Sequence, residues 1–189
     1  MSAGAALERL RTPNLLLNRI GESDRDELCR LHADARVMEW LGGVRSEAET
    51  DAQLRDFDAH WRRHGFGPWA LRDPATHAFL GRGGLRRISA LGRDEVELLY
   101  ALDASAWGRG LATELARESA RLAFTRLGLD ELVGFTLPHN ARSRAVLERA
   151  GFAYQRDFLH AGRPHVLYRL RAPGSDEVDE VDRPRERRV

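Results

Sequence analysis

The chain has 189 residues, of which 42% are hydrophobic and 31% charged, and its formal net charge is +1. These values fit one soluble globular domain and exclude a wholly disordered chain. So weak a net field gives no reason to expect nucleic acid as a partner. Apart from histidine, every basic side chain is arginine, which excludes a lysine-dependent phosphate loop and Schiff-base catalysis by lysine.

The protein is expected to be cytoplasmic and to have no membrane contact. Its one cysteine, Cys29, allows no intrachain disulfide and is expected to be a buried structural residue. No apolar run resembles a signal peptide or reaches membrane-spanning length. Tails are expected at residues 1–11 and 172–189, the second charged and disordered. The domain is therefore expected to cover residues 12–171.

The first part of this domain opens with a strand candidate followed by two helices. The strand is expected at residues 15–20, and a helix is expected to open at Ser23. Ser46 and Glu49 have the spacing of a capping box. A second helix should therefore begin at Ser46, and it should end at Gly65, where the chain can turn left-handed.

The rest of the domain reads as three strands, a helix, a strand, a helix and a closing hairpin. These elements are expected at residues 68–72, 78–88, 95–102, 111–126, 132–136, 140–149, 152–159 and 165–170. Glycines at 81, 83 and 84 indicate a bulge or a close backbone approach in the second of these strands. The order of elements predicts a mixed sheet with helices on its faces, which is an α+β fold.

Two glycines separate the strongest strand pattern, residues 95–102, from the helix that follows. The segment reads Trp107-Gly108-Arg109-Gly110-Leu111-Ala112. Glycines allow tight turns, and the first turn of a helix presents unpaired N–H groups and the positive end of a dipole. The segment therefore suits a diphosphate. Two other interpretations are open: a plain helix-entry turn, and a dinucleotide fingerprint completed by Asp130.

The motifs around this loop resemble those of the GNAT acyltransferases. Residues 97–100 and 107–114 are similar to the family's E-I-G-Y and W-G-x-G-x-A-T-E, within EVELLYALDASAWGRGLATELARESARLAF. A second stretch, residues 140–152, resembles N-x-x-S-x-x-V-L-E-x-x-G-F. The first stretch is most similar to the branch that includes the bacterial ribosomal-protein N-terminal alanine and serine acetyltransferases.

The resemblance implies a GNAT fold, with a mixed, mostly antiparallel sheet splayed at its centre and helices on both faces. It also implies acetyl-CoA as the donor, and no metal. The diphosphate would lie on the backbone amides of residues 107–112, and the pantetheine arm would run beside residues 99–102. The residues implied in cofactor binding are Leu99, Leu102, Trp107, Gly108, Arg109, Gly110, Leu111, Ala112, Thr113, Asn140 and Ser143.

Three side chains are expected to take part in proton transfer. Glu97 is the expected base, directly or through water, because an amine must lose its proton before it attacks. The alternative for Glu97 is exposure to solvent or an ion pair with Arg86. Ser143 or Tyr100 would protonate the departing thiolate, although Ser143 is equally suited to capping or bracing its helix, and Tyr100 is better suited to the core or the wall of the site. A backbone N–H near Leu99 or Tyr100 would stabilise the carbonyl oxygen.

The acceptor is expected to be a primary amine, either a peptide N-terminal α-amine or a small molecule, which attacks directly in a ternary complex. Trp40, Phe66 and Trp69 are the aromatic candidates for its pocket. A succinyl-CoA-using enzyme, a non-catalytic CoA-binding or sensor module, and a homodimer are left open. His60 and His64 have a metal-pair spacing, but with no evident third ligand a solvated helix face is expected.

Overall fold

The computed structural model describes residues 7–89 and 92–174, which form one eight-stranded sheet in the order β1-β2-β3-β4-β5-β6-β8-β7. The strands are β1 (Arg9–Arg11), β2 (Leu16–Arg19), β3 (Pro68–Arg72), β4 (Phe79–Ile88), β5 (Glu95–Leu102), β6 (Glu131–Thr136), β7 (Ala153–His160) and β8 (Arg163–Arg171). Neighbouring strands are antiparallel except β5 and β6, which are parallel and share one register pair, Glu97 with Val133. The sheet is therefore mixed and splayed at its centre, as predicted.

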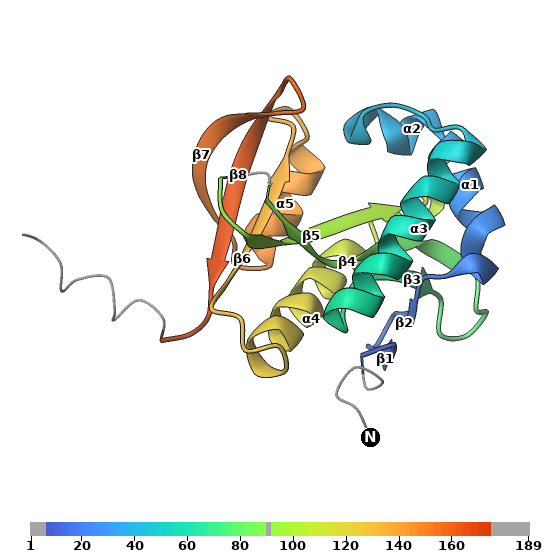
Figure 1. Ribbon diagram of the computed structural model, residues 1–189, viewed down its shortest axis with the longest axis horizontal. Coiled ribbons are helices and arrows are strands. Elements are labelled where there is room, and N and C mark those ends of the chain that lie inside the picture. The colour runs from blue at the N-terminus through green and yellow to red at the C-terminus, as the bar shows by residue number, and fades with distance from the viewer. Residues whose placement is uncertain (1–6, 90–91, 175–189) are drawn as a thin grey trace, which may run out of the picture.

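Helices cover both faces of the sheet (Figure 1). They are α1 (Arg25–Ala33), α2 (Ala35–Met38), α3 (Glu47–His64), α4 (Leu111–Thr125) and α5 (Ala141–Arg149), with short 3-10 turns η1 (Glu22–Asp24), η2 (Glu39–Leu41) and η3 (Ala104–Ala106). Successive β5 residues point to opposite faces. Leu99 and Ala101 accordingly pack in the cluster that holds α1 and α3 side chains, whereas Leu98 and Leu102 pack in the cluster that holds α4 side chains.

Glycines in β4 allow the bend and the close helix packing that the sequence predicts. The register between β3 and β4 shifts between Leu71 and Arg72, and Gly81 beside this bulge has a φ of 139°. A Cβ on Gly83 would lie 2.5 Å from the side chain of Leu115 in α4. Both predicted features, a bulge and a close approach, are therefore confirmed.

The predicted N-terminal tail at residues 1–11 is too long. Arg9–Arg11 forms β1 against β2, and Leu7 is buried, with its carbonyl accepting a hydrogen bond from Nε1 of Trp69 at 2.8 Å. The ordered part therefore begins before residue 12. At the other end, the N–H of Ala172 donates to Asp130, and residues 175–189 of the predicted charged tail lie outside the described residues.

The first helical region also differs from the prediction. Residues 22–24 form a 3-10 turn, so α1 begins at Arg25 rather than at Ser23. The short α2 was not predicted, because four residues carry too little periodicity to register; Asp34 caps it by accepting from the N–H of Arg36. By contrast, the capping box of Ser46 and the left-handed stop at Gly65 are confirmed.

Candidate active site

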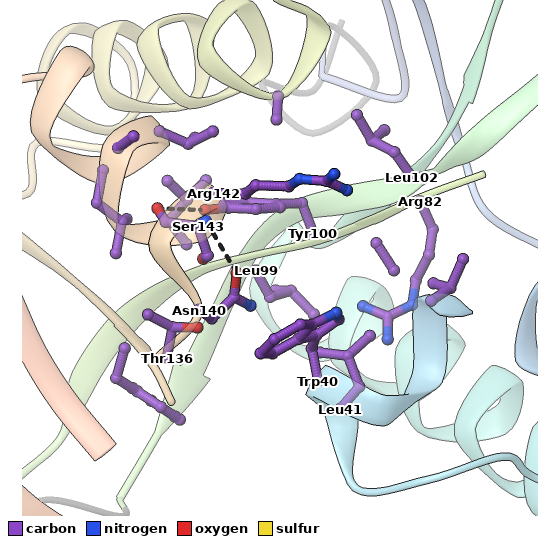
Figure 2. Close-up of a pocket in the computed structure, with 18 of the residues that line it drawn as sticks. Trp40, Leu41, Arg82, Leu99, Tyr100, Leu102, Thr136, Asn140, Arg142 and Ser143 are labelled. Carbon is purple, nitrogen blue, oxygen red and sulfur yellow. Dashed lines mark hydrogen bonds between the residues drawn. The ribbon is translucent and has the colours of Figure 1, made fainter. Parts of the chain in front are cut away.

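A cavity of about 1020 Å³ opens where β5 and β6 splay apart. Its walls come from the α2–η2 region, the β5 edge, the N-termini of α4 and α5, and the β7–β8 hairpin. Its volume is that of a site for a large small-molecule ligand. Figure 2 shows side chains from both sides of the sheet converging on this space. Of the predicted cofactor residues, those lining it are Leu99, Leu102, Trp107, Gly108, Gly110, Leu111, Ala112, Thr113, Asn140 and Ser143.

The glycine loop presents free backbone amides to the cavity. Gly108 and Gly110 have φ values of 74° and 77°, a region that disfavours side chains, and a Cβ on either would meet nothing within 4 Å. Within the described residues, the N–H groups of Gly108 and Gly110 donate no recorded hydrogen bond, and α4 has no side-chain cap. These unpaired donors, together with the helix dipole and open space in front of them, fit a diphosphate.

Trp107 and Arg142 line the cavity beside the glycine loop. Nε1 of Trp107 donates to the carbonyl of Leu102 at 2.9 Å, which fixes the indole, and the guanidinium of Arg142 lies 5.0 Å from its ring centroid. The side chain of Arg109 points elsewhere, to Asp73 at 3.4 Å, and does not line the cavity. Arg142, which the sequence did not single out, lines the cavity in place of Arg109 and brings a positive charge to it.

Tyr100, Ser143 and Asn140 form a hydrogen-bonded chain on the α5 side of β5 (Figure 2). The Tyr100 hydroxyl lies 2.8 Å from Oγ of Ser143, and Oδ1 of Asn140 accepts from the N–H of Ser143 at 3.1 Å, which caps α5. Burial raises the pKa of Tyr100 to about 12, against a smaller opposing effect of the Ser143 hydrogen bond. Tyr100 therefore keeps its proton at neutral pH, and Ser143 braces it while Asn140 serves as the cap.

Glu97 lines the cavity from the opposite face of β5, and it is paired. Its carboxylate lies 2.6 Å from a terminal nitrogen of Arg86, and its side chain is 8% exposed. The ion pair is the alternative that the sequence left open for Glu97. Glu97 lies on the same face of β5 as Leu99, whereas Tyr100 lies on the opposite face. A reactant lying along the β5 edge would therefore have a carboxylate on one side and a phenol on the other.

Only one of the three aromatic acceptor candidates belongs to the cavity. Trp40 lines it, and its ring lies 5.4 Å from that of His139. The predictions for Phe66 and Trp69 are wrong: they are 4% and 1% exposed, and they pack in the core. Trp69 sits edge-on to Trp61 at 6.0 Å, on β3, which β4 separates from the open edge of β5.

The cavity is also lined by arginines that the sequence analysis missed. Arg45 and Arg82 line it together with Arg86, and Gln53 of α3 belongs to the same lining. Arg82 gave a partial signal in the sequence, because it interrupts the apolar and glycine-rich first part of a central strand, where a charge is costly unless it is used.

The remaining candidates are structural. Cys29 is half-buried rather than fully buried and does not line the cavity. His60 is not on a solvated face: its Nδ1 contacts the carbonyl of Phe66 at 2.8 Å, its Nε2 accepts from the N–H of Arg87 at 2.9 Å, and burial lowers its pKa to about 4. Across residues 7–89 and 92–174, no cluster of three metal-ligating side chains occurs. No described helix is long and apolar enough to cross a membrane.

An open strand edge beside a helix end with free amides is the arrangement that holds a nucleotide thioester, and the protein is an acyl-CoA-dependent acetyltransferase. The match to the acetyltransferase (GNAT) domain covers residues 14–153, and the chain belongs to this family. The predicted fold, the use of coenzyme A as the acyl carrier and the enzyme class are thereby confirmed.

Individual relatives have several kinds of acceptor. FsC-acetyl coenzyme A-N(2)-transacetylase of Aspergillus fumigatus is 30% identical over 160 residues, which is 80% of this chain and 67% of the relative. An acetyltransferase structure from Agrobacterium tumefaciens is 26% identical, with a TM-score of 0.77, covering 87% of this chain and 94% of that one. A ribosomal L7/L12 alpha-N-protein acetyltransferase, solved with coenzyme A, has a TM-score of 0.72 at 18% identity, over 87% and 98%.

Proposed function

We propose that the protein moves an acetyl group from acetyl-CoA to a primary amine by direct attack in a ternary complex. The observation that carries the proposal is the position of Glu97 and Tyr100 on opposite faces of the same strand, both lining one cavity with the free amides of the glycine loop. One face would handle the proton of the amine, and the other would handle the proton of the leaving thiol.

The donor side is formed by backbone groups and a few side chains. The amides of residues 108–113 and the guanidinium of Arg142 would hold the diphosphate, and the open edge of residues 98–102 would bind the pantetheine arm. Asn140, whose Oδ1 is committed to the cap, has its amide N–H groups left to donate to that arm. When bound, acetyl-CoA supplies an acyl group activated as a thioester.

An ammonium nitrogen loses two protons, the first before it attacks and the second to solvent as the amide forms, and the sulfur gains one. Glu97 would accept the first proton from the ammonium, which leaves the neutral amine that attacks, with Arg86 holding the carboxylate in place. The new N–C bond forms as the C–S bond breaks, a backbone N–H near Leu99 or Tyr100 would stabilise the carbonyl oxygen, and the Tyr100 hydroxyl, braced by Ser143, would protonate the thiolate.

The acceptor would be a peptide N-terminal α-amine or a small-molecule amine. The first is supported by the likeness of the motifs to the ribosomal-protein branch, and the second by the Aspergillus relative, which is named as an N(2)-transacetylase. Trp40 would form the apolar wall of the acceptor pocket. A homodimer stays a prediction.

The test compares Glu97→Gln with Glu118→Gln across a pH series, using thiol release from acetyl-CoA. Glu118 pairs with Arg121 at 2.7 Å on the surface of α4, so its variant loses a similar ion pair outside the cavity. The Glu97 variant should lose about 100-fold or more of its rate at low pH. The loss should shrink as pH rises toward the amine pKa, which is near 8 for an α-amine.

Three results would contradict the proposal in different ways. Unchanged kinetics in Glu97→Gln would remove Glu97 from the mechanism. A rise in melting temperature with coenzyme A, without thiol release for any amine in a broad screen, would indicate a CoA-binding module instead. Faster turnover with succinyl-CoA than with acetyl-CoA would reassign the donor.

A further inference from the structure

Arg82 is a buried arginine without a partner. It is 3% exposed and lines the cavity, yet it makes neither a hydrogen bond nor an ion pair with any residue in 7–89 and 92–174. Its Nε is fully buried and unbonded. Its one specific contact is with the ring of Phe57, whose centroid lies 5.6 Å from the guanidinium carbon. Figure 2 shows Arg82 extending toward Trp40 and Leu41 on the far side of the pocket.

Such an arrangement is costly for the protein by itself. A buried charge is normally paired, because the loss of hydration is repaid only by an opposite charge and a full set of hydrogen bonds. Burial, with added repulsion from Arg45 and Arg86, lowers the pKa of Arg82 to about 9. The side chain is therefore held in a position that destabilises the protein until an anion arrives, which is a property of binding sites rather than of cores.

The surrounding charges leave an excess of positive charge. Arg45, Arg82 and Arg86 face one carboxylate, that of Glu97, which is bonded to Arg86. Glu49 attracts Arg45, but its own carboxylate is bound to the N–H and hydroxyl of Ser46 in the cap of α3.

The other titratable neighbour adds no charge. His32 is fully buried against Thr50, and burial together with Arg82 and Arg45 lowers its pKa to about 3. It is therefore neutral at working pH. The wall formed by Arg45, Arg82 and Arg86, the arginine wall, thus has room for a further anionic group.

The arginine wall lies away from the diphosphate site. Arg82 pairs with Ala101 in the β4–β5 register and so points to the α1–α3 face, whereas the amides of the glycine loop begin α4 on the other face. The lining of the same cavity also holds an unpaired acceptor, the buried Oε1 of Gln53. A guanidinium fork matches a carboxylate, and a free amide oxygen in the same cavity can accept from an N–H group of the molecule that carries it.

We propose that the arginine wall, with Arg82 at its centre, binds a carboxylate carried by one of the two reactants. The proposal rests on the proposed acetyl transfer and narrows its substrate class. The carboxylate has two possible sources: an acidic amine acceptor, or the free end of a dicarboxylic acyl donor. In either case Arg82 acts as a specificity-determining residue, and the bound carboxylate gives it the bidentate partner that the protein lacks.

The first experiment measures binding without turnover, on the full chain saturated with coenzyme A. Succinate should raise the melting temperature of the wild type and of Arg87→Met, and should raise that of Arg82→Met far less. Arg87 is an exposed arginine on the same strand and is the matched control. Arg82→Met in the absence of succinate should melt at the same temperature as the wild type or higher, since an unpaired buried charge has been removed. Arg82→Gln serves as a second variant of different shape.

The second experiment identifies the source of the carboxylate from ratios of kcat/KM. The first pair compares two acceptors, alanyl-glutamate and alanyl-glutamine amide, with acetyl-CoA as the donor. The second pair compares two donors, succinyl-CoA and acetyl-CoA, with alanyl-glutamine amide as the acceptor. One of these ratios should favour the carboxylate by roughly 30-fold or more, and Arg82→Met should bring it close to one. Preference in the first pair assigns the carboxylate to the acceptor, and preference in the second assigns it to the donor.

The outcomes separate this proposal from the proposed function. Suppose that succinate raises the melting temperature of the wild type but not of Arg82→Met, and that no amine is turned over. This result supports the subsite and contradicts the proposed acetyl transfer. Turnover with no carboxylate preference in either pair, and equal succinate effects in Arg82→Met and the wild type, overturns the subsite and leaves the acetyl transfer intact. A larger shift with inorganic phosphate than with succinate also overturns it, as does a strong fall in melting temperature in both Arg82 variants.

Discussion

The N-termini of α3 and α4 are built in opposite ways. At α3, Oγ of Ser46 accepts from the N–H of Glu49, and the Glu49 carboxylate accepts in return from the N–H of Ser46 at 2.8 Å. At α4 the preceding residue is Gly110, which has no side chain to cap with. The acidic residue of its first turn, Glu114, is bound to the N–H and side chain of Asn14.

The difference shows that a missing cap can itself be a functional feature. A helix end that serves only the fold has its N–H groups satisfied by the chain, because unpaired donors cost free energy. The end of α4 faces a large cavity at the open edge of β5, and there the same donors are left for a ligand. The N-terminus of α3 is therefore structural, whereas the N-terminus of α4 has the features of a binding site.

The largest loss of coenzyme A affinity is expected when a carboxylate is placed at the N-terminus of α4, where it can bind the free amides as the Glu49 carboxylate does at α3. Gly110→Asp should weaken binding of coenzyme A by about 2–3 kcal/mol, or roughly 30- to 150-fold, since a carboxylate there occupies the amides and repels the diphosphate. Aspartate and asparagine both tolerate the left-handed backbone at this position. The measurement is isothermal titration with coenzyme A.

Gly110→Asn is the matched control for that substitution. It has the same shape and backbone tolerance but no charge, so its loss of affinity should be much smaller. Equal losses in the two variants would show that Gly110 matters for its conformation alone, and that the charge at the end of α4 is unimportant.

The N-terminus of α5 is an intermediate case and sharpens the comparison. Asn140 caps the helix through Oδ1, while its amide group is left for the cavity. Asn140→Ser keeps a capping oxygen but loses the amide, so stability should change by less than about 0.5 kcal/mol. Affinity for coenzyme A should fall by about 1 kcal/mol, near fivefold. Urea unfolding and titration measure the two effects separately.

Asn140→Ala removes both functions and tests whether they are separable. It should show the same loss of affinity as the serine variant and, in addition, a loss of about 1 kcal/mol in the free energy of unfolding. If the serine variant bound coenzyme A as tightly as the wild type, Asn140 would be only a cap, and the contact implied for it would be wrong.

Features set by local sequence were the predictable ones. The strands at 68–72 and 95–102 coincide with the prediction, and the capping box at Ser46 and the stop at Gly65 were found because their signals span a few residues. The glycine loop was also legible, since glycines before a helix restrict the structure directly.

Features set by distant contacts could not be predicted in the same way. Whether Trp69 faces a pocket or the core depends on strand order, which places β4 between it and the open edge. The pairing of Arg86 with Glu97 follows from the β4–β5 register. Arg82 became meaningful only when the structure showed that no described residue in 7–89 and 92–174 pairs with it.

The smallest effect on coenzyme A binding is expected at α3. Ser46→Ala removes the cap from this helix, whose N-terminus binds no ligand in our proposal. The free energy of unfolding should fall by about 1 kcal/mol, since one first-turn N–H loses its partner. Affinity for coenzyme A should be unchanged, because the α3 N-terminus does not line the cavity. A loss of affinity as large as that of Gly110→Asp would mean that α3 positions the site through the arginine wall, and the two helix ends would then no longer be functionally distinct.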